Sequence, residues 1–312
     1  MRIELLARDV YFQEFCSSVA GALRLAGCDV HLADSFSGRP YDYHVVVGPH
    51  LFPDVPRITS GILVAIQTEQ QPVRPTTNSR LLRNQKRFRT IAGYYDAIFD
   101  WIPELALQNN RVLIPYGGAS REFRHHEQRY EICFIGNIHG NRREQMLHAL
   151  TPDFQFFPSF SPGFGDAKAA AIQQSKILLN IKFYEDGGFE SPRMFDYLSA
   201  GAFVISEHTA VTTPFSAGYD FIEFRGEQQL RELLRYYLNH DSARRQIARQ
   251  GHATSQRYTF AHVAQILLQE LAGVQPRGRI QRLWSWGSSR LKCASFQTRD
   301  TISQLRRRLQ FR

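Results

Sequence analysis

Cysteine is scarce in this sequence, with four residues among 312. Cys16, Cys28, Cys133 and Cys293 lie far apart and form no C-x-x-C pair. The spacing therefore indicates neither a zinc site nor a disulfide framework. We expect reduced thiols, most of them buried.

Long apolar runs are also absent. No stretch approaches the roughly 20 apolar residues that cross a bilayer, and Glu4 stands where a signal peptide needs an apolar segment. These features predict a cytoplasmic protein. Hydrophobic residues at 43% and charged residues at 21% are typical of a folded globular protein. A length of 312 residues predicts two domains.

The net charge of +9 is confined to one part of the chain. Residues 274–312 hold ten of the 38 basic residues and one of the 29 acidic residues, so the rest of the chain has 28 of each sign. A neutral body does not suit a protein that binds along nucleic-acid phosphates. We therefore expect no nucleic-acid partner, although a nucleic-acid-binding protein that uses the basic tail is an alternative.

The tail has a helical pattern of its own. Ile280, Leu283, Trp284 and Leu291 recur at near-helical spacing, with arginines at the positions between them. An apolar stripe flanked by arginines suits the interface of an anionic membrane, which predicts a peripheral position on the inner face. A helix that packs on the N-terminal domain would have the same pattern.

The rest of the sequence alternates short β-branched or apolar runs with amphipathic segments, which is typical of parallel sheets flanked by helices. A polar, glycine-containing stretch separates two series of such runs. The first series of expected strands is 3–6, 29–32, 44–47, 62–66, 97–99 and 112–114, and the second is 132–135, 154–157, 177–181, 203–205 and 221–224. We predict an N-terminal domain at 1–120, a linker at 121–130, a C-terminal domain at 131–273 and the tail at 274–312.

Ligands of open parallel sheets bind beyond the carboxyl ends of the strands. In the C-terminal domain, Gly136 and Asn137 follow the first strand and Lys182 follows the third. Neither domain carries G-x-G-x-x-G or a P-loop, so no dinucleotide or ATP site is expected. Arg142 and Arg143 begin the helix after Gly136, where cations and free N–H groups would share one anion. Paired arginines would also suit a solvated helix face.

The segment NIKFYEDGGFESPRMFDYLSAGAFVISE, residues 180–207, is more informative. A helix is predicted to begin near Ser191. Glu190, Arg193 and Asp196 stand three apart and thus share one face near its start. An arginine and a carboxylate presented together can bind a diphosphate and ribose hydroxyls, respectively, although a surface row of ion pairs would have the same spacing.

FESPRMFDYLSAGAFVISE resembles the donor-site segment of GT-B glycosyltransferases, in which two acids, a small-residue helix end, a glycine and a strand follow one another. The E-x-x-R helix start is closer still to CgeB-like bacterial glycosyltransferases. IGNIHGNRREQML, QSKILLNIKFYE and DAIFDWIPELA followed by VLIPYGG extend the similarity, in order, over residues 44–255. The resemblance implies an α/β protein of GT-B architecture, with two Rossmann-like parallel-sheet domains facing a cleft and a basic helical tail.

The resemblance also implies roles for single residues. Asp196 falls where the family's second acid contacts the donor ribose, and Arg193 falls near the diphosphate. Arg142 or Arg143 would be the other phosphate cation. The sequence departs from the family at the first acid of the E-x7-E form, where Gly188 stands, so the retaining mechanism does not transfer directly.

The N-terminal domain is expected to supply the acceptor side and a catalytic base. Glu69 and Asp100 follow predicted strands and are the preferred bases. His50 is a further candidate, and a packed histidine beside Pro49 is an equal interpretation. No D-x-D doublet follows a strand, so we expect neither a metal nor another cofactor; arginines, lysines and helix dipoles would stabilise the leaving diphosphate.

The implied function is metal-independent transfer of a sugar from a nucleotide-diphosphate sugar to a hydroxyl group. The acceptor would be a glycan, a lipid-linked molecule or a protein. A sugar-nucleotide epimerase with the GT-B fold is a second alternative, since it would share the donor contacts.

Overall fold

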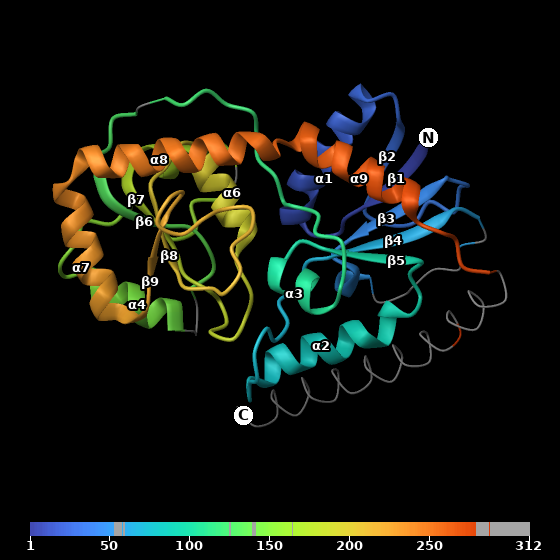
Figure 1. The fold of residues 1–312 in the computed structure, drawn as a ribbon, viewed down its shortest axis with the longest axis horizontal. Coiled ribbons are helices and arrows are strands. Elements are labelled where there is room, and N and C mark those ends of the chain that lie inside the picture. The colour runs from blue at the N-terminus through green and yellow to red at the C-terminus, as the bar shows by residue number, and fades with distance from the viewer. Residues whose placement is uncertain are drawn as a thin grey trace, which may run out of the picture. The chain divides into compact units, whose positions relative to one another are not determined.

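The computed structural model describes residues 1–52, 58, 60–124, 126–138, 142–163, 165–278 and 287. Within them the chain forms two parallel sheets with accompanying helices (Figure 1). It divides into two compact units: Met1–Trp101, Leu105–Ile114 and the residues from Ala264 onward form the first, and Ile102–Glu104 and Pro115–Val263 form the second. The predicted α/β class with two parallel-sheet domains is confirmed.

The first unit contains a five-stranded parallel sheet with the strand order β2-β1-β3-β4-β5. Its strands are β1 (Arg2–Leu6), β2 (Asp29–Ala33), β3 (Tyr43–Val47), β4 (Ile62–Gln67) and β5 (Ala97–Asp100). Its helical elements are α1 (Val10–Leu25), η1 (Pro49–Leu51), α2 (Ser79–Ala92) and the part of α3 (Pro103–Gln108) from Leu105 onward. Residues 45–47 and 63–66 are buried at every position. Such continuous apolar burial is expected of strands that are covered on both faces of a parallel sheet.

The second unit contains a four-stranded parallel sheet with the order β6-β7-β8-β9. Its strands are β6 (Tyr130–Phe134), β7 (Ser175–Asn180), β8 (Val204–Glu207) and β9 (Ile222–Phe224). The helical elements that follow β6 are α4 (Arg142–Leu150), α5 (Asp166–Gln173), α6 (Ser191–Ser199), α7 (Gly226–Asn239), α8 (Asp241–Ser255), η2 (Gln256–Tyr258) and α9 (Phe260–Gly273). Strand residues such as Ile177, Leu179 and Ile205 pack with Leu230 and Leu234 of α7 in one apolar core.

Close packing against α8 fixes the position of α6. A Cβ atom on Gly251 of α8 would lie 2.4 Å from the carbonyl oxygen of Asp220 and 2.7 Å from Cδ2 of Leu198, so only glycine fits there. His252 Nδ1 lies 3.1 Å from the carbonyl oxygen of Ser199, the last residue of α6. A carbonyl at a helix end has no partner within the helix, and the histidine supplies one.

Two of the predicted strands do not form. Residues 112–114 and 154–157 each contribute a single isolated bridge in place of a ladder. The bridges pair Asp100 with Leu113 and Ile132 with Phe156. Pro115 and Pro158 directly follow the two segments, and a proline cannot donate the next hydrogen bond of a ladder.

The limits of the two units differ from the predicted domain limits at α9, whose residues from Ala264 onward cluster with the first unit. The predicted tail helix lies outside the described residues from position 279 on, apart from Gly287. No helix in the described part of the chain is both long enough and apolar enough to cross a membrane.

Candidate functional site

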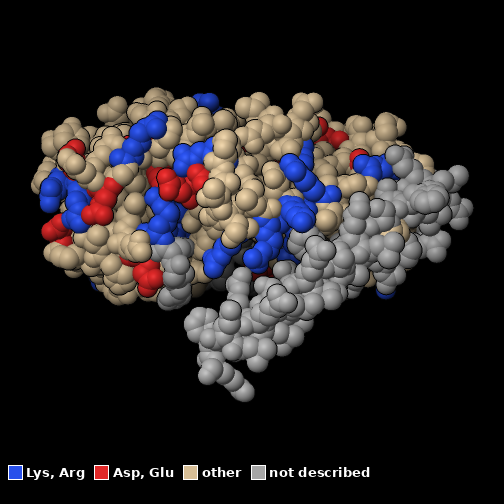
Figure 2. All heavy atoms as spheres, turned by 90° about the horizontal axis from the view of Figure 1, so that it is seen from below, with Lys and Arg blue, Asp and Glu red and all other residues tan. Residues whose placement is uncertain are grey.

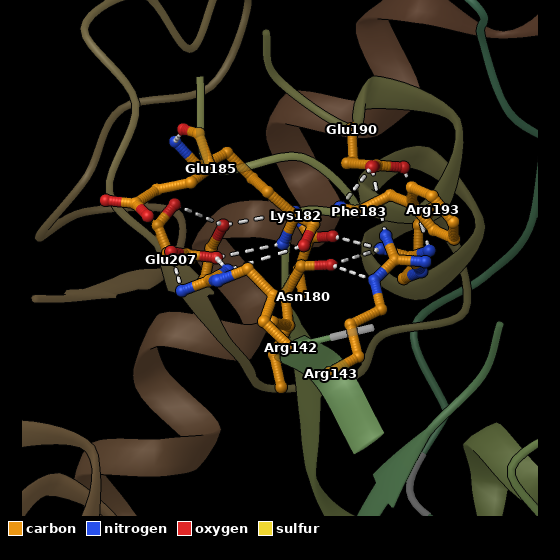
Figure 3. A network of polar contacts seen from close by, with 11 residues as sticks. Arg142, Arg143, Asn180, Lys182, Phe183, Glu185, Glu190, Arg193 and Glu207 are labelled. Carbon is orange, nitrogen blue, oxygen red and sulfur yellow. Dashed lines mark hydrogen bonds and ion pairs between the residues drawn. The ribbon is translucent and has the colours of Figure 1, made fainter. Parts of the chain in front are cut away.

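Polar residues follow three neighbouring strands of the second sheet. Gly136 and Asn137 come after β6, Lys182 comes after β7, and Glu207 is the last residue of β8. Because these strands are parallel, their carboxyl ends meet at one edge, where loops and helix starts can hold an anion. Figure 3 shows Lys182 and Glu207 at these strand ends, with Arg142 directed toward Glu207.

Glu190 lies between two arginines at the start of α6. Its Oε1 is 2.9 Å from Nη2 of Arg143, and its Oε2 is 3.7 Å from Nη2 of Arg193 (Figure 3). The backbone N–H of Phe183 donates to Oε1 at 3.0 Å. Burial alone would raise the pKa of Glu190, but the two guanidinium groups and the Phe183 N–H more than offset this, so the pKa lies below its usual value. Glu190 is therefore ionised at neutral pH.

Arg193 holds the ends of β6 and β7 together. Its Nε donates to the carbonyl oxygen of Ile135 at 2.9 Å, and its Nη1 donates to Oδ1 of Asn180 at 2.7 Å and to the carbonyl oxygen of Ile181 at 3.3 Å. A Cβ atom on Gly136 would lie 2.9 Å from Nη2 of Arg193. The glycine is needed because the guanidinium occupies the space of a side chain.

Arg143 is more deeply buried than Arg193. Its Nε donates to the carbonyl oxygen of Ile181 at 2.8 Å and its Nη1 to that of Asn137 at 3.1 Å. The guanidinium also lies over the rings of Phe134 and Phe183, at 5.3 and 5.0 Å from their centroids. Burial lowers the pKa of Arg143 to about 10, against the opposing effect of Glu190. Arg143 therefore stays charged at neutral pH.

Arg142, Glu207 and Lys182 form the second half of the site. Arg142 donates to Glu207 through both terminal nitrogens, at 2.7 and 2.8 Å, and the backbone N–H of Lys182 donates to Glu207 Oε2 at 3.0 Å. Lys182 Nζ donates to the carbonyl oxygen of Glu185 at 2.8 Å. Together with Arg143 and Arg193, Arg142 and Lys182 bring four cationic side chains to the strand ends. The carboxylates of Glu190 and Glu207 lie among them.

Asp196 lies apart from the Glu190 ion pairs, although the sequence places it on the same helix face. Its Oδ2 is 3.1 Å from Nζ of Lys168 in α5. The carboxylate is largely buried, with 23% of the side chain exposed.

Comparison with known proteins covers both the sequence and the fold. Residues 142–269 match the family described as glycosyl transferase-like. The matched region is less than half of the chain, and it contains Arg142, Arg143, Lys182, Glu190 and Arg193. A search of curated protein sequences finds no match.

Solved structures match nearly the whole chain. HepE from Anabaena, described in complex with UDP and glucose, has a TM-score of 0.66 at 11% identity, with 87% of this chain and 99% of that chain covered. Sucrose-phosphate synthase from Thermosynechococcus elongatus has a TM-score of 0.59 at 11% identity, with 87% and 98% covered. AviGT4, a glycosyltransferase of avilamycin A biosynthesis, has a TM-score of 0.59 at 9% identity, with 88% and 98% covered.

At these identities the structural likeness shows the fold, and the glycosyl transferase-like region adds the class of enzyme. The chain has the GT-B fold, and its residues 142–269 form a glycosyl transferase-like region. The sequence predicts that the donor binds at the strand ends of the second unit. Gly136 and Lys182 were placed there by the order of the strands, and Arg193 was placed there by the resemblance.

In the first unit, Glu69 pairs with His50. His50 Nε2 lies 2.9 Å from Oε2 of Glu69, and Nδ2 of Asn84 donates to Oε1 of Glu69 at 2.7 Å. Glu69 follows β4, and His50 lies in η1 after β3. The Glu69 side chain is 29% exposed. The pair is therefore at the carboxyl ends of its sheet, with Glu69 partly exposed and His50 largely buried.

Asp100 has a different environment from Glu69. It is 0% exposed, and its Oδ2 is 3.0 Å from Nη1 of Arg111. A base must reach the hydroxyl from which it takes a proton. A buried carboxylate paired with a guanidinium suits a structural role, so Glu69 is the better placed of the two predicted bases.

Sequence reasoning missed Glu104, in α3 after β5. It lies within the stretch DAIFDWIPELA, from which only Asp100 was selected. A carboxylate close after a strand end was the available signal. The structure shows that its Oε2 accepts a hydrogen bond from the backbone N–H of Phe189 at 3.1 Å.

Proposed function

We propose that this glycosyltransferase moves a sugar from a nucleotide-diphosphate sugar to a hydroxyl group of an acceptor. The supporting observation is the group of four cationic side chains at the carboxyl ends of β6, β7 and β8, which pair there with the carboxylates of Glu190 and Glu207 and with backbone carbonyl oxygens. The helices α4 and α6 also begin at this edge, and helix starts favour an anion. A diphosphate suits such a site.

The exposure of the arginines distinguishes their proposed roles. The side chain of Arg142 is 29% exposed, against 12% for Arg193 and 3% for Arg143. We propose that Arg142 contacts the diphosphate, and that Arg143 and Arg193 hold the strand ends in place. Lys182 is 7% exposed and is proposed to add positive charge on the diphosphate side of the site. Asp196 is proposed to bind the ribose, a role carried over from the resemblance.

The cations of the site are proposed to stabilise the leaving diphosphate without a metal. Fixed positive groups aimed at developing charge are a sufficient means of catalysis in principle. Two structures of HepE are described in complex with UDP or UDP-glucose, which makes UDP-sugars the first donors to test.

Glu69 is proposed to act as the base that takes the proton of the acceptor hydroxyl. The support is its position after β4, its partial exposure and its contact with His50. His50 can stabilise the ionised carboxylate and fix its orientation. A positioned base of this kind contributes about 10²- to 10⁴-fold to a rate.

We propose that the protein contacts an anionic membrane, where a lipid-linked or cell-envelope acceptor would be found. The support is the composition of residues 279–312 and a basic surface on α2, made of the exposed residues Arg80, Arg83, Lys86 and Arg89. Residues 70–95 contain no acidic residue. Figure 2, seen from below relative to Figure 1, shows Lys and Arg side chains gathered on the face to which α2 belongs.

Ligand-induced thermal shift with UDP-, GDP- and dTDP-sugars tests the donor proposal, and release of free nucleotide tests the reaction. Arg142→Gln is expected to reduce the shift at a given sugar concentration, whereas Arg257→Gln, a change at an exposed arginine, is expected to preserve it. EDTA should leave nucleotide release unchanged. Wild-type protein that binds none of these sugars would contradict the donor proposal, and a new sugar epimer formed without acceptor would support the epimerase alternative.

A further inference from the structure

Glu104 carries a buried carboxyl group, one oxygen of which has no hydrogen-bond partner among the described residues. The residue is 3% exposed. Its Oε2 accepts the hydrogen bond from Phe189, whereas its Oε1 is buried and has no hydrogen-bond partner among the described residues. Buried polar atoms are satisfied in most folded proteins, so an exception calls for an explanation.

The place of Glu104 connects it with the donor site. Phe189 follows two buried glycines, Gly187 and Gly188, in the loop between β7 and α6. Gly188 is the position at which the chain departs from the first acid of the related GT-B sequences. A carboxyl group from α3 therefore lies beside the position at which the sequence lacks one. Ile102–Glu104 clusters with the second unit, in agreement with this contact.

The chemistry of the Glu104 carboxyl group indicates which part of the donor it can bind. Burial raises the pKa of Glu104, and the Phe189 N–H and the nearby charge of Lys182 offset this only in part. A carboxyl oxygen is a poor neighbour for phosphate oxygens and a good partner for hydroxyl groups. Lys182, on the proposed diphosphate side, lies close enough to act on Glu104. In a nucleotide sugar, the sugar is bonded directly to the diphosphate. A residue next to the diphosphate side of the site is therefore placed to contact the sugar.

We propose that Glu104 binds a hydroxyl group of the donor sugar through Oε1. This proposal rests on the proposed nucleotide-sugar function and adds the residue that recognises the sugar. The loop at 187–189 positions the carboxyl group by holding Oε2, and bound donor satisfies Oε1. Glu104 is then a determinant of which sugar the enzyme accepts, and it makes no contact with the nucleotide.

The test combines Glu104 variants with donors that lack single hydroxyl groups. UDP, UDP-glucose and the deoxyglucose analogues of UDP-glucose are the probes, or the corresponding set for the nucleotide that binds best. Glu104→Gln can still accept the Phe189 bond and is expected to lower kcat/KM for the complete donor by about 10- to 100-fold, with the affinity for UDP unchanged. Glu232→Gln, the same change at an exposed glutamate of α7, should change neither.

The deoxy donors separate recognition from a structural role. One deoxy donor should be a poor substrate of the wild-type enzyme and should lose nothing further in Glu104→Ala. Equal losses for every donor, or a matching loss of UDP affinity, would overturn the proposal. If either variant fails to fold, the wild-type enzyme alone still decides, because equal use of all deoxy donors would also overturn it. Wild-type protein that binds no nucleotide sugar would refute the proposed function itself.

Discussion

Arg142 donates two hydrogen bonds to the carboxylate of Glu207, at 2.7 and 2.8 Å. Glu207 also accepts a hydrogen bond from the backbone N–H of Lys182, so the pair lies at the proposed donor site. A diphosphate at this edge would compete with Glu207 for Arg142. We therefore expect the carboxylate to lower the affinity for the anion while it keeps the guanidinium in place.

Opposite changes at this pair should have opposite effects on UDP binding. Arg142→Gln is expected to weaken binding by about 10- to 100-fold, because a charge-assisted contact is lost. Glu207→Gln removes the competing charge but keeps an oxygen for Lys182, so it should strengthen binding severalfold. Isothermal titration with UDP measures both. Equal weakening by both variants would show that the intact ion pair is required for the shape of the site.

Replacement of Arg193 should destabilise the second unit. Arg193→Ala leaves the carbonyl oxygen of Ile135 and the side chain of Asn180 without their donor, which is expected to cost about 3–5 kcal/mol, the range for breaking a buried charged network. Arg257→Ala is the control, since Arg257 is exposed. Urea unfolding gives both free energies. Unchanged stability in Arg193→Ala would contradict a structural role and would instead favour contact between Arg193 and the diphosphate in the wild-type protein.

Stability should depend on pH through Glu190. Its pKa is lower in the folded protein than in the unfolded chain, so its contribution is present above the unfolded value of about 4.3 and is lost as pH falls through the folded value. Glu190→Gln should be less stable by about 3 kcal/mol at neutral pH. The difference from wild type should shrink in acid. Urea unfolding as a function of pH measures it, with the exposed Glu227→Gln as the control.

The sequence allowed the helix of the donor segment to be placed closely. It was predicted to begin near Ser191, and the structure has α6 at Ser191–Ser199, followed by Gly201 at a φ of +75°. Local signals of this kind depend on neighbouring residues. The strands at 112–114 and 154–157 were wrong because apolar character reports burial and carries no information about a hydrogen-bonded partner strand.

The partners of the site residues could not be predicted in the same way. Spacing indicated that Glu190 and Arg193 share one face of the helix, and their side chains form an ion pair at 3.7 Å. It did not indicate that Arg193 would be held by Ile135, 58 residues away, or that Asp196 would pair with Lys168. The contact between Glu104 and Phe189 spans 85 residues. Such pairs follow from the packing of the fold, which one sequence does not encode locally.

Replacement of Glu69 should lower turnover, whereas replacement of Asp100 should lower stability. Glu69→Gln is expected to lower turnover by about 10²- to 10⁴-fold with donor binding and stability unchanged. Asp100→Asn should lower stability, because it leaves Arg111 without its buried partner, while the surviving folded enzyme turns over normally. Nucleotide release and thermal unfolding separate the two effects. Normal turnover in Glu69→Gln would assign the base to another residue.

The basic tail supports the last prediction, although most of it lies outside the described residues. Arg277 still belongs to the folded body, since its backbone N–H donates to Oδ1 of Asp96 at 2.9 Å. Deletion of residues 279–312 should therefore leave the fold and UDP binding intact. It is expected to abolish sedimentation with vesicles of phosphatidylglycerol and phosphatidylcholine, because each basic residue near an anionic surface contributes about 1 kcal/mol.

Charge reversal on α2 shows whether the body shares in this binding. Arg83→Glu with Lys86→Glu should weaken sedimentation of the full-length protein in proportion to the lost charge, and added salt should weaken it further. Phosphatidylcholine vesicles alone should bind neither protein. If the full-length protein ignores anionic vesicles at low salt, or if the deletion unfolds the body, the tail is a packed helix and the acceptor need not be sought at a membrane.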